Sequence, residues 1–335
     1  MTIQNNIASL FRSFFHREPL CIAPIQGDAS SRQYFRVTNA DGTLIACHDP
    51  AFNAAIQAGY TFLLMHGILS RHTIPVPALI ALNAEHGLLF LEDCGDLLLQ
   101  HLFDAPDKAK IPDYYRKIID LLIQFQSIRG NDKEVPFCLS FDREKLRFEF
   151  DFFIEHALLN YFAPIFDEKS MSGLRHEFES IAEILVQPRH FVLNHRDFHS
   201  RNILIHHDRA VIIDFQDARM GLPQYDAVSL IRDSYVTLDP VLTEELKSYH
   251  YNALRDHNLS VMSFDEYLYY FDIMAFQRNI KALGTFAYQT SVKKNSSFEH
   301  SIAPTLAYIP EYINDRSELR GAGNILQPLL ERVVP

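Results

Sequence analysis

The chain has 335 residues, of which 47% are hydrophobic and 22% charged, and this composition is typical of a globular protein rather than a disordered one. At roughly 150 residues per domain, the length predicts about two domains or one large two-lobed unit. The formal net charge of −11 argues against broad nucleic-acid binding, and no apolar run approaches the roughly 18 residues of a membrane span. We therefore expect neither nucleic acid nor a membrane as a partner.

The N-terminal segment and the cysteines bear on the compartment. Residues 1–15 lack the charged region and the apolar run of a signal peptide. Cys21, Cys47, Cys94 and Cys138 are far apart in the sequence and form no CxxC pair, which favours free thiols over a metal site or a disulfide framework. We expect a cytoplasmic protein.

The first part of the chain has the pattern of a strand-rich lobe. Turn-forming residues beside alternating apolar ones predict a hairpin, and short apolar runs predict further strands. Pro75 and Pro77 exclude a central strand at their own positions. The predicted elements are a hairpin within residues 22–36, strands over 44–47 and 88–91, and a helix with apolar side chains at helical spacing over 54–70.

After Gly95 the pattern changes to helix. Apolar residues at helical spacing predict a helix over 112–129, and Asp142 is expected to cap the start of the next one. Two short apolar runs, 203–205 and 211–213, are separated by turn residues and predict a second hairpin. The helical pattern resumes beyond this hairpin, so the sequence indicates a small mixed lobe followed by a large helical one.

The segment around the second hairpin carries the clearest chemistry. Asp197 and Asn202 are five residues apart on a predicted loop, and Asp214 follows the second apolar run. A hairpin would return Asp214 beside Asn202, so that a carboxylate oxygen and an amide oxygen converge as ligands for Mg²⁺. Asp197 is then left to receive a proton from a substrate hydroxyl. This division of roles is what phosphoryl transfer from ATP requires.

Residues 195–202 and 214–216 match the pattern H-x-D-x-x-x-x-N followed by D-F-x. In these motifs the chain resembles the aminoglycoside phosphotransferase and choline kinase branch of the protein-kinase-like superfamily. The resemblance implies an α+β fold of the protein-kinase-like bilobal type. Residues 1–94 would form a small, β-rich N-lobe that covers the nucleotide. Residues 95–335 would form a larger, mainly helical C-lobe with the catalytic loop, the metal and the substrate site.

Further runs narrow the resemblance. Residues 27–36 read G-D-A-S-S-R-Q-Y-F-R, residues 214–218 read D-F-Q-D-A, and residues 225–230 read Y-D-A-V-S-L. These runs are similar to those of the bacterial anomeric kinases for N-acetylmuramate and N-acetylglucosamine. The resemblance implies transfer of the ATP γ-phosphate to the C1 hydroxyl of an N-acetylated amino sugar in cell-wall recycling, with Mg²⁺ as cofactor. We expect the enzyme to be a monomer.

The resemblance also implies roles for single residues. Asp197 would be the catalytic base, and Asn202 and Asp214 would hold Mg²⁺. The remaining implicated residues are Ser30, Ser31 and Arg32 at the ATP phosphates, Leu91 and Asp93 at the adenine, and Asp217, Arg232 and Asp233 at the substrate.

Several polar residues near these positions have a structural alternative. His195 and Asp226 are interpreted as supports of the 195–202 loop. Asp217 either reaches the metal or sugar, or supports the same loop through His195 or Arg196. Gln277–Lys281 either lines the substrate side or is an ordinary polar helix face.

The chain departs from the protein-kinase pattern at one strand. Residues 44–49 contain no Lys that could hold the α- and β-phosphates, and the nearest cations are Arg36 and His48. The absence is either a trait of the anomeric kinases or the sign of an inactive catalyst. Arg32 and Arg36 are the candidate replacements as phosphate ligands.

Two other functions stay open from the sequence. The same fold would serve an aminoglycoside- or choline-type phosphotransferase, and Asp226, Asp233 and Asp239 are then candidate carboxylates around a cationic acceptor. A nucleotide-binding pseudokinase is suggested by the missing Lys alone. It is disfavoured because all three residues of the catalytic pattern are present.

Overall fold

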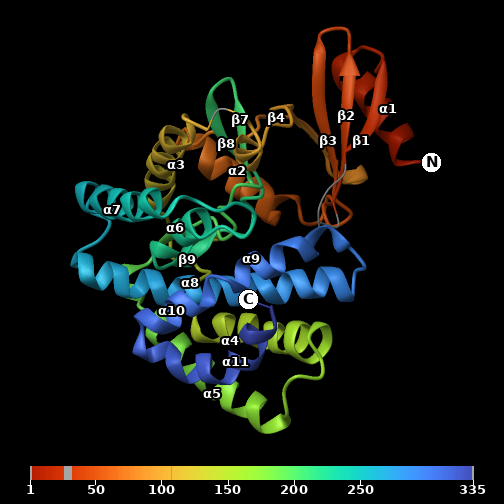
Figure 1. Cartoon of the computed structure of the whole chain (residues 1–335). Helices are drawn as coiled ribbons and strands as arrows, with labels where there is room; N and C mark the ends of the chain where they lie inside the picture. Colours follow the sequence, from red (N-terminus) through yellow and green to blue (C-terminus); the bar gives the residue numbers. More distant parts are fainter. Residues whose placement is uncertain (1, 26–31, 107, 334–335) are drawn as a thin grey trace. The chain divides into compact units, whose positions relative to one another are not determined.

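The computed structural model describes residues 2–25, 32–106 and 108–333. The chain divides into two compact units (Figure 1). The first combines Met1–Leu98 with Ile203–Gln216, and the second combines Leu99–Asn202 with Asp217–Pro335. Each unit therefore contains segments that are far apart in the sequence. The lobe boundary after residue 94 stays a prediction.

The first unit contains a five-stranded antiparallel sheet with the strand order β1-β2-β3-β5-β4. Each strand pairs antiparallel with its neighbours, and the register places Phe35 opposite Ala46 and Ala46 opposite Phe90. The elements are α1 (Ile3–Phe15), β1 (Cys21–Ile25), β2 (Gln33–Asn39), β3 (Gly42–His48), α2 (Thr61–Arg71), β4 (Leu79–Asn83), β5 (Leu88–Glu92), β7 (Ile203–His206) and β8 (Arg209–Ile212).

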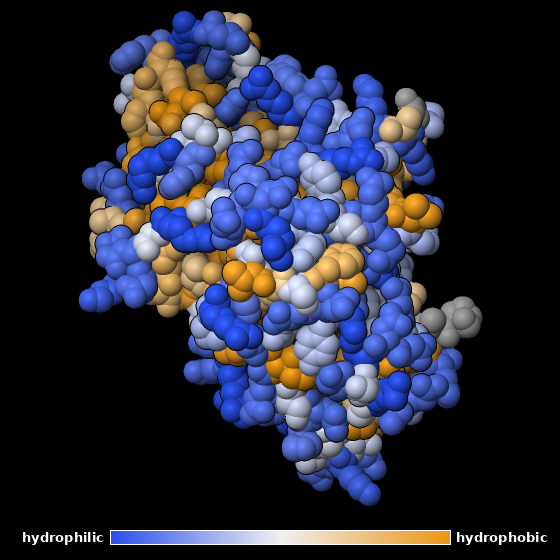
Figure 2. Space-filling view, turned by 90° about the vertical axis from the view of Figure 1, so that its left-hand side faces the viewer, coloured by the Kyte–Doolittle hydropathy of each residue, from blue (hydrophilic) through white to orange (hydrophobic). Residues whose placement is uncertain are grey.

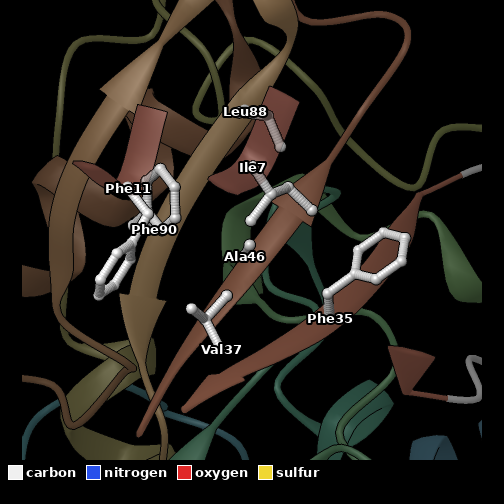
Figure 3. Packing of buried hydrophobic residues seen from close by; sticks show 7 residues of the cluster. All are labelled: Ile7, Phe11, Phe35, Val37, Ala46, Leu88 and Phe90. Carbon is white, nitrogen blue, oxygen red and sulfur yellow. The ribbon is translucent and has the colours of Figure 1, made fainter. Parts of the chain in front are cut away.

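One face of this sheet is buried against α1. Side chains at every second position of β2 and β5 point to the same face, as the strand period of two requires. They form a cluster with two residues one turn apart on α1 (Figure 3). The buried members are Ile7, Phe11, Phe35, Val37, Ala46, Leu88 and Phe90. This cluster holds the N-terminal helix on the sheet.

The structure confirms the hairpin within residues 22–36 and the strands over 44–47 and 88–91. The helix prediction over 54–70 is wrong at its start, because α2 begins at Thr61 and the preceding segment holds only a short 3-10 turn at Gln57–Gly59. The spacing of apolar residues does not distinguish this irregular segment from the first turns of a helix. The edge strand β4 was also missed, since it begins just after the two prolines.

The second hairpin, β7 and β8, packs with residues of the first unit. The Ile205 N–H donates to the Leu97 carbonyl at 2.7 Å, and the Ile212 N–H donates to the Pro75 carbonyl at 2.9 Å. Its apolar side chains join a small buried cluster with Cys94. The residues that follow β8, including Asp214, therefore belong to the first unit.

The second unit is mainly helical, and α8 is its longest helix (Figure 1). Helices α4 and α6 both pack on α8. Gly284 of α8 permits the close approach, because a Cβ there would lie 2.8 Å from the Cα of Phe153. The elements are α3 (Ile111–Gln126), α4 (Arg143–Phe153), the π-helix η4 (Ile154–Tyr161), α5 (Glu168–Leu185), β6 (Val192–Asn194), β9 (Arg219–Gly221), α6 (Gln224–Ile231), α7 (Pro240–Asp256), α8 (Phe264–Ser291), α9 (Ile302–Leu306), α10 (Ile309–Asp315) and α11 (Arg320–Val333).

Two sequence predictions for this unit are confirmed. Helix α3 covers most of the predicted range 112–129. Asp142 caps α4, since its carboxylate accepts the Lys145 backbone N–H at 2.8 Å.

On the face drawn in Figure 2, hydrophilic residues predominate and hydrophobic ones form separate patches, the most extended at the upper left. Among the described residues, no helix is long and apolar enough to cross a membrane.

Candidate active site

The 195–202 loop follows the buried strand β6, and Asp226 of α6 holds its first two residues through hydrogen bonds. The Asp226 carboxylate accepts the backbone N–H groups of His195 at 2.5 Å and Arg196 at 3.0 Å. Arg196 has a φ of 87°, a left-handed conformation that costs energy for a residue with a side chain. The two hydrogen bonds compensate for this strain, so the sequence interpretation of Asp226 as a loop support is confirmed.

A second carboxylate anchors the far half of the loop. One oxygen of Asp233 accepts the Ser200 N–H at 2.8 Å, and the other accepts the Tyr235 N–H at 2.8 Å. His195 is fully buried, and its Nδ1 accepts the Asp197 N–H at 3.3 Å. The Asn202 side-chain N–H donates to the Asp197 carbonyl at 3.0 Å. The loop is thus preorganised by its own side chains and by α6.

The buried carboxylate of Asp233 predicts a pH-dependent stability. Burial raises its pKa to about 6, from an ordinary value of about 3.9. Because the folded-state pKa is the higher one, this stabilising contribution is complete below about pH 4 and is lost as the pH rises through about 6. Between pH 5 and 8, the free energy of unfolding of the wild type should fall by about 1 kcal/mol more than that of Asp233→Asn. Denaturant titrations at both pH values measure this difference, and parallel pH dependences would contradict it.

Asp197 lies among cations. The Lys281 ammonium donates to its Oδ1 at 2.7 Å, and the Arg278 guanidinium lies 3.5 Å from the same atom. Although burial disfavours its charge, Lys281, Arg278 and Arg196 together hold the Asp197 pKa well below its usual range. The pKa of nearby His199 is lowered to about 3, mainly by burial, so this imidazole is neutral. Asp197 is therefore an ionised carboxylate at neutral pH.

The charges around Asp197 form a larger cluster in the second unit. Glu149, nearly fully buried on α4, lies 3.5 Å from the Lys145 ammonium and 3.9 Å from the Arg196 guanidinium. Arg196 also lies 3.5 Å from Asp217. The cluster contains the cations Lys145, Arg196, Arg219, Arg278 and Lys281 and the carboxylates Glu149, Asp197 and Asp217. Asp226 and Asp233 also interact with Arg278, so the cluster has five cations and five carboxylates in all.

The predicted substrate residues differ in how they are held. Asp217 is mostly exposed beside Arg196, which agrees with its alternative reading as a loop support. The Arg232 guanidinium pairs with Glu311 and lies over the rings of Tyr308 and Tyr312. Both Asp233 oxygens are used by backbone N–H groups. These contacts favour structural roles for Arg232 and Asp233.

The predicted nucleotide residues lie in the first unit. Ser30 and Ser31 lie outside the described residues. The Arg32 guanidinium pairs with Asp49 at 2.9 Å, and the Tyr60 hydroxyl donates to the same carboxylate. Leu91 is paired within the sheet on β5. The nucleotide roles of Arg32 and Leu91 stay predictions.

Arg36 and Asp93 are also linked within the first unit. The Arg36 guanidinium donates to Asp93 at 2.6 Å and to Asp96 at 2.8 Å. The Asp93 carboxylate accepts the Gly95 N–H as well, at 3.0 Å. Arg36 therefore fixes the segment after β5, which weakens its candidacy as a phosphate ligand.

The two predicted metal ligands belong to different units. Asp214 is exposed after β8, has a φ of 64°, and accepts a hydrogen bond from the Gln216 amide. Asn202 ends the 195–202 loop. One carboxylate and one amide oxygen suit Mg²⁺, which keeps several waters and is completed by phosphate oxygens. Among the described residues there is no group of three or more His, Cys, Asp or Glu side chains that could hold a metal alone.

Lys281 was not identified from the sequence as the partner of Asp197. Its sequence signal was the presence of two cations, Arg278 and Lys281, three residues apart on a largely apolar helix. Such a pair on a buried helix face requires an anionic partner. The sequence did not indicate which anion this would be.

A five-stranded antiparallel unit and a helical unit that carries an anchored H-x-D-x-x-x-x-N loop define a fold of the protein-kinase-like class. Residues 22–257 match the phosphotransferase enzyme family APH, and the chain belongs to this family. The predicted fold class and family resemblance are confirmed.

Individual proteins agree with this assignment. Over 318 residues the chain is 27% identical to the N-acetylmuramate/N-acetylglucosamine kinase of Pseudomonas aeruginosa. The alignment covers 93% of this chain and 89% of that protein. The choline kinase structure from Cryptosporidium parvum has a TM-score of 0.61 at 15% identity and covers 99% of this chain and 100% of its own. An ADP-bound aminoglycoside phosphotransferase has a TM-score of 0.59 at 12% identity, with coverages of 90% and 95%. These two structures share the fold.

Proposed function

We propose that this enzyme is an ATP- and Mg²⁺-dependent kinase that phosphorylates the C1 hydroxyl of N-acetylmuramate or N-acetylglucosamine in cytoplasmic recycling of cell-wall sugars. The relative from Pseudomonas aeruginosa, which aligns over 93% of the chain, supports this acceptor class. The observation that carries the proposal is that Asp226, Asp233 and Asp239, the candidate carboxylates for a cationic acceptor, all accept backbone N–H groups of the protein itself.

A cationic acceptor such as an aminoglycoside or choline would require carboxylates free to surround it. The three candidates have other partners in the structure. Asp226 and Asp233 accept backbone N–H groups of the 195–202 loop and of Tyr235. Asp239 caps α7 by accepting the Val241 N–H at 2.9 Å. Lys281, Arg278 and Arg196 already neutralise the charge of Asp197, so this carboxylate is a poor partner for a cationic acceptor.

In the proposed reaction, Asp197 orients the acceptor hydroxyl and receives its proton. An anomeric hydroxyl is more acidic than an ordinary alcohol, so even a carboxylate whose pKa is held low suffices as the acceptor of this proton. The hydroxyl oxygen forms a bond to the γ-phosphorus as the β–γ bridging bond breaks, and the electron pair leaves with ADP. Mg²⁺, when bound by Asn202 and Asp214, would neutralise charge on the phosphate oxygens.

The other proposed roles are in the nucleotide and sugar sites. Ser30, Ser31 and Arg32 would bind the ATP phosphates, and the segment at Leu91 and Asp93 would bind the adenine. Asp217 is the residue that we propose to contact the substrate, because its side chain stays mostly exposed beside Arg196. For Arg232 and Asp233 the contacts support the loop and helix packing rather than the sugar.

The test is an ATP-consumption assay with Mg²⁺ and four acceptors: N-acetylmuramate, N-acetylglucosamine, kanamycin and choline. The position of the new phosphate is read by NMR. We expect a C1-phosphorylated amino sugar. Turnover on kanamycin or choline alone would overturn the acceptor assignment and keep the phosphotransferase class. ATP binding without turnover on any of the four would favour the pseudokinase.

A further inference from the structure

We propose that Lys281 is a catalytic residue whose ammonium group contacts the phosphoryl group while it is transferred. The inference rests on the proposed role of Asp197 as the proton acceptor. Lys281 lies on α8, 84 residues beyond Asp197 in the sequence. Its ammonium lies 2.7 Å from Asp197 Oδ1. Its side chain is 15% exposed and that of Asp197 is 25% exposed, so both groups are sheltered yet reachable.

The hydrogen-bonding capacity of Lys281 supports a further partner. An ammonium group has three donors. Within the described part of the chain, Asp197 is the only hydrogen-bond acceptor of this ammonium. Two donors therefore remain for the oxygens of a bound ligand. A sheltered ammonium with a single partner is well suited to a multiply charged phosphoryl group.

The neighbouring cations are held by other groups. The Arg278 guanidinium donates to the Tyr225 hydroxyl at 3.2 Å and lies over the Tyr225 ring. Arg196 lies between Glu149 and Asp217. In contrast, Lys281 reaches its carboxylate through a flexible four-carbon chain. Of the three cations nearest Asp197, Lys281 is the one that can move to a ligand without breaking a second contact.

The chemistry of the step places the phosphoryl group near this ammonium. The acceptor oxygen must lie within hydrogen-bond distance of Asp197 to give up its proton. The γ-phosphorus forms its new bond to that same oxygen, so it lies within a few bond lengths of Asp197 and of Lys281. Charge on the equatorial phosphoryl oxygens is largest in the transition state, and a preorganised cation stabilises it there.

The first test compares kcat and KM of Lys281→Met, Lys281→Gln and Lys281→Arg. We expect the two neutral variants to lose about 10²- to 10³-fold in kcat, as for other single donors to a transition-state oxyanion, with the KM for ATP within about threefold of the wild type. Lys281→Arg should recover part of the loss because it keeps the charge. An equal loss in Lys281→Arg would contradict a charge contact.

The matched control is Lys247→Met. Lys247 is a buried lysine of the same unit that pairs with Glu244 at 2.7 Å and lies over the Phe271 ring, but it has no contact with Asp197. We expect its kcat to stay near the wild-type value. A comparable loss in this control would show that removing any buried lysine is enough, and would overturn the proposal.

The deciding measurement uses ADP with aluminium fluoride, which mimics the transferring phosphoryl group and needs no acceptor. We expect wild-type affinity for ADP to tighten when aluminium fluoride is added, and Lys281→Met and Lys281→Gln to lose at least tenfold of this tightening while they bind ADP alone normally. Unchanged tightening in both variants would restrict Lys281 to positioning Asp197. Because this readout involves no sugar, its failure is distinct from a failure of the acceptor assignment.

Discussion

Replacing Asp197 with asparagine is expected to lower kcat by about 10³-fold and to leave nucleotide binding almost unchanged. Asparagine keeps the shape of the side chain but has no carboxylate to receive the hydroxyl proton. Asp226 and Asp233 anchor the backbone of the loop. Within the described part of the chain, neither forms a hydrogen bond with the Asp197 side chain, so the loop should keep its conformation in the variant. Steady-state kinetics together with calorimetric titration of ADP separate the two effects.

A control for this variant is Asp256→Asn. Asp256 is an exposed aspartate at the end of α7 in the same unit, and we expect no change in its kinetics. Asp197→Asn with near-wild-type turnover would remove Asp197 as the proton acceptor. The same result would also remove the basis for the role of Lys281.

The second large effect is expected from Asp226→Ala, in both stability and activity. The substitution leaves the buried N–H groups of His195 and Arg196 without an acceptor, which costs about 2–5 kcal/mol of unfolding free energy. It also removes the contacts that hold Arg196 at its φ of 87°. The loop should then sample other conformations, and kcat should fall even at temperatures where the chain stays folded.

Denaturant unfolding and kinetics of Asp226→Ala and Asp226→Asn measure this effect. Asparagine retains one oxygen acceptor, so it should recover part of the stability. The contrasting control is Asp239→Ala, in which an exposed aspartate also accepts backbone N–H groups, those of Val241 and Leu242. Its loss should be about 1 kcal/mol, because water can replace an exposed helix cap. Equal losses at the two sites would refute the importance of burial.

Much of the fold followed from local patterns. The alternation of β2, the continuous burial of β5, the spacing of α3 and the cap at Asp142 all appear in the structure as the sequence predicts. Each of these features depends on residues within a few positions of one another. The start of α2 was misplaced because its first apolar residues belong to an irregular turn, which has no periodic signature.

The sequence by itself also placed the proposed proton acceptor Asp197, the proposed metal ligand Asn202 and the supporting His195 on one loop, because these residues are close together along the chain. Only the tertiary structure decided what surrounds them. Asp226 and Lys281 reach the loop from 31 and 84 residues away, and the 203–216 hairpin joins the first unit rather than the second. The physical reason is that a buried charge needs an opposite charge or a donor, but this requirement does not specify which distant residue supplies it. That choice is made when the helices pack.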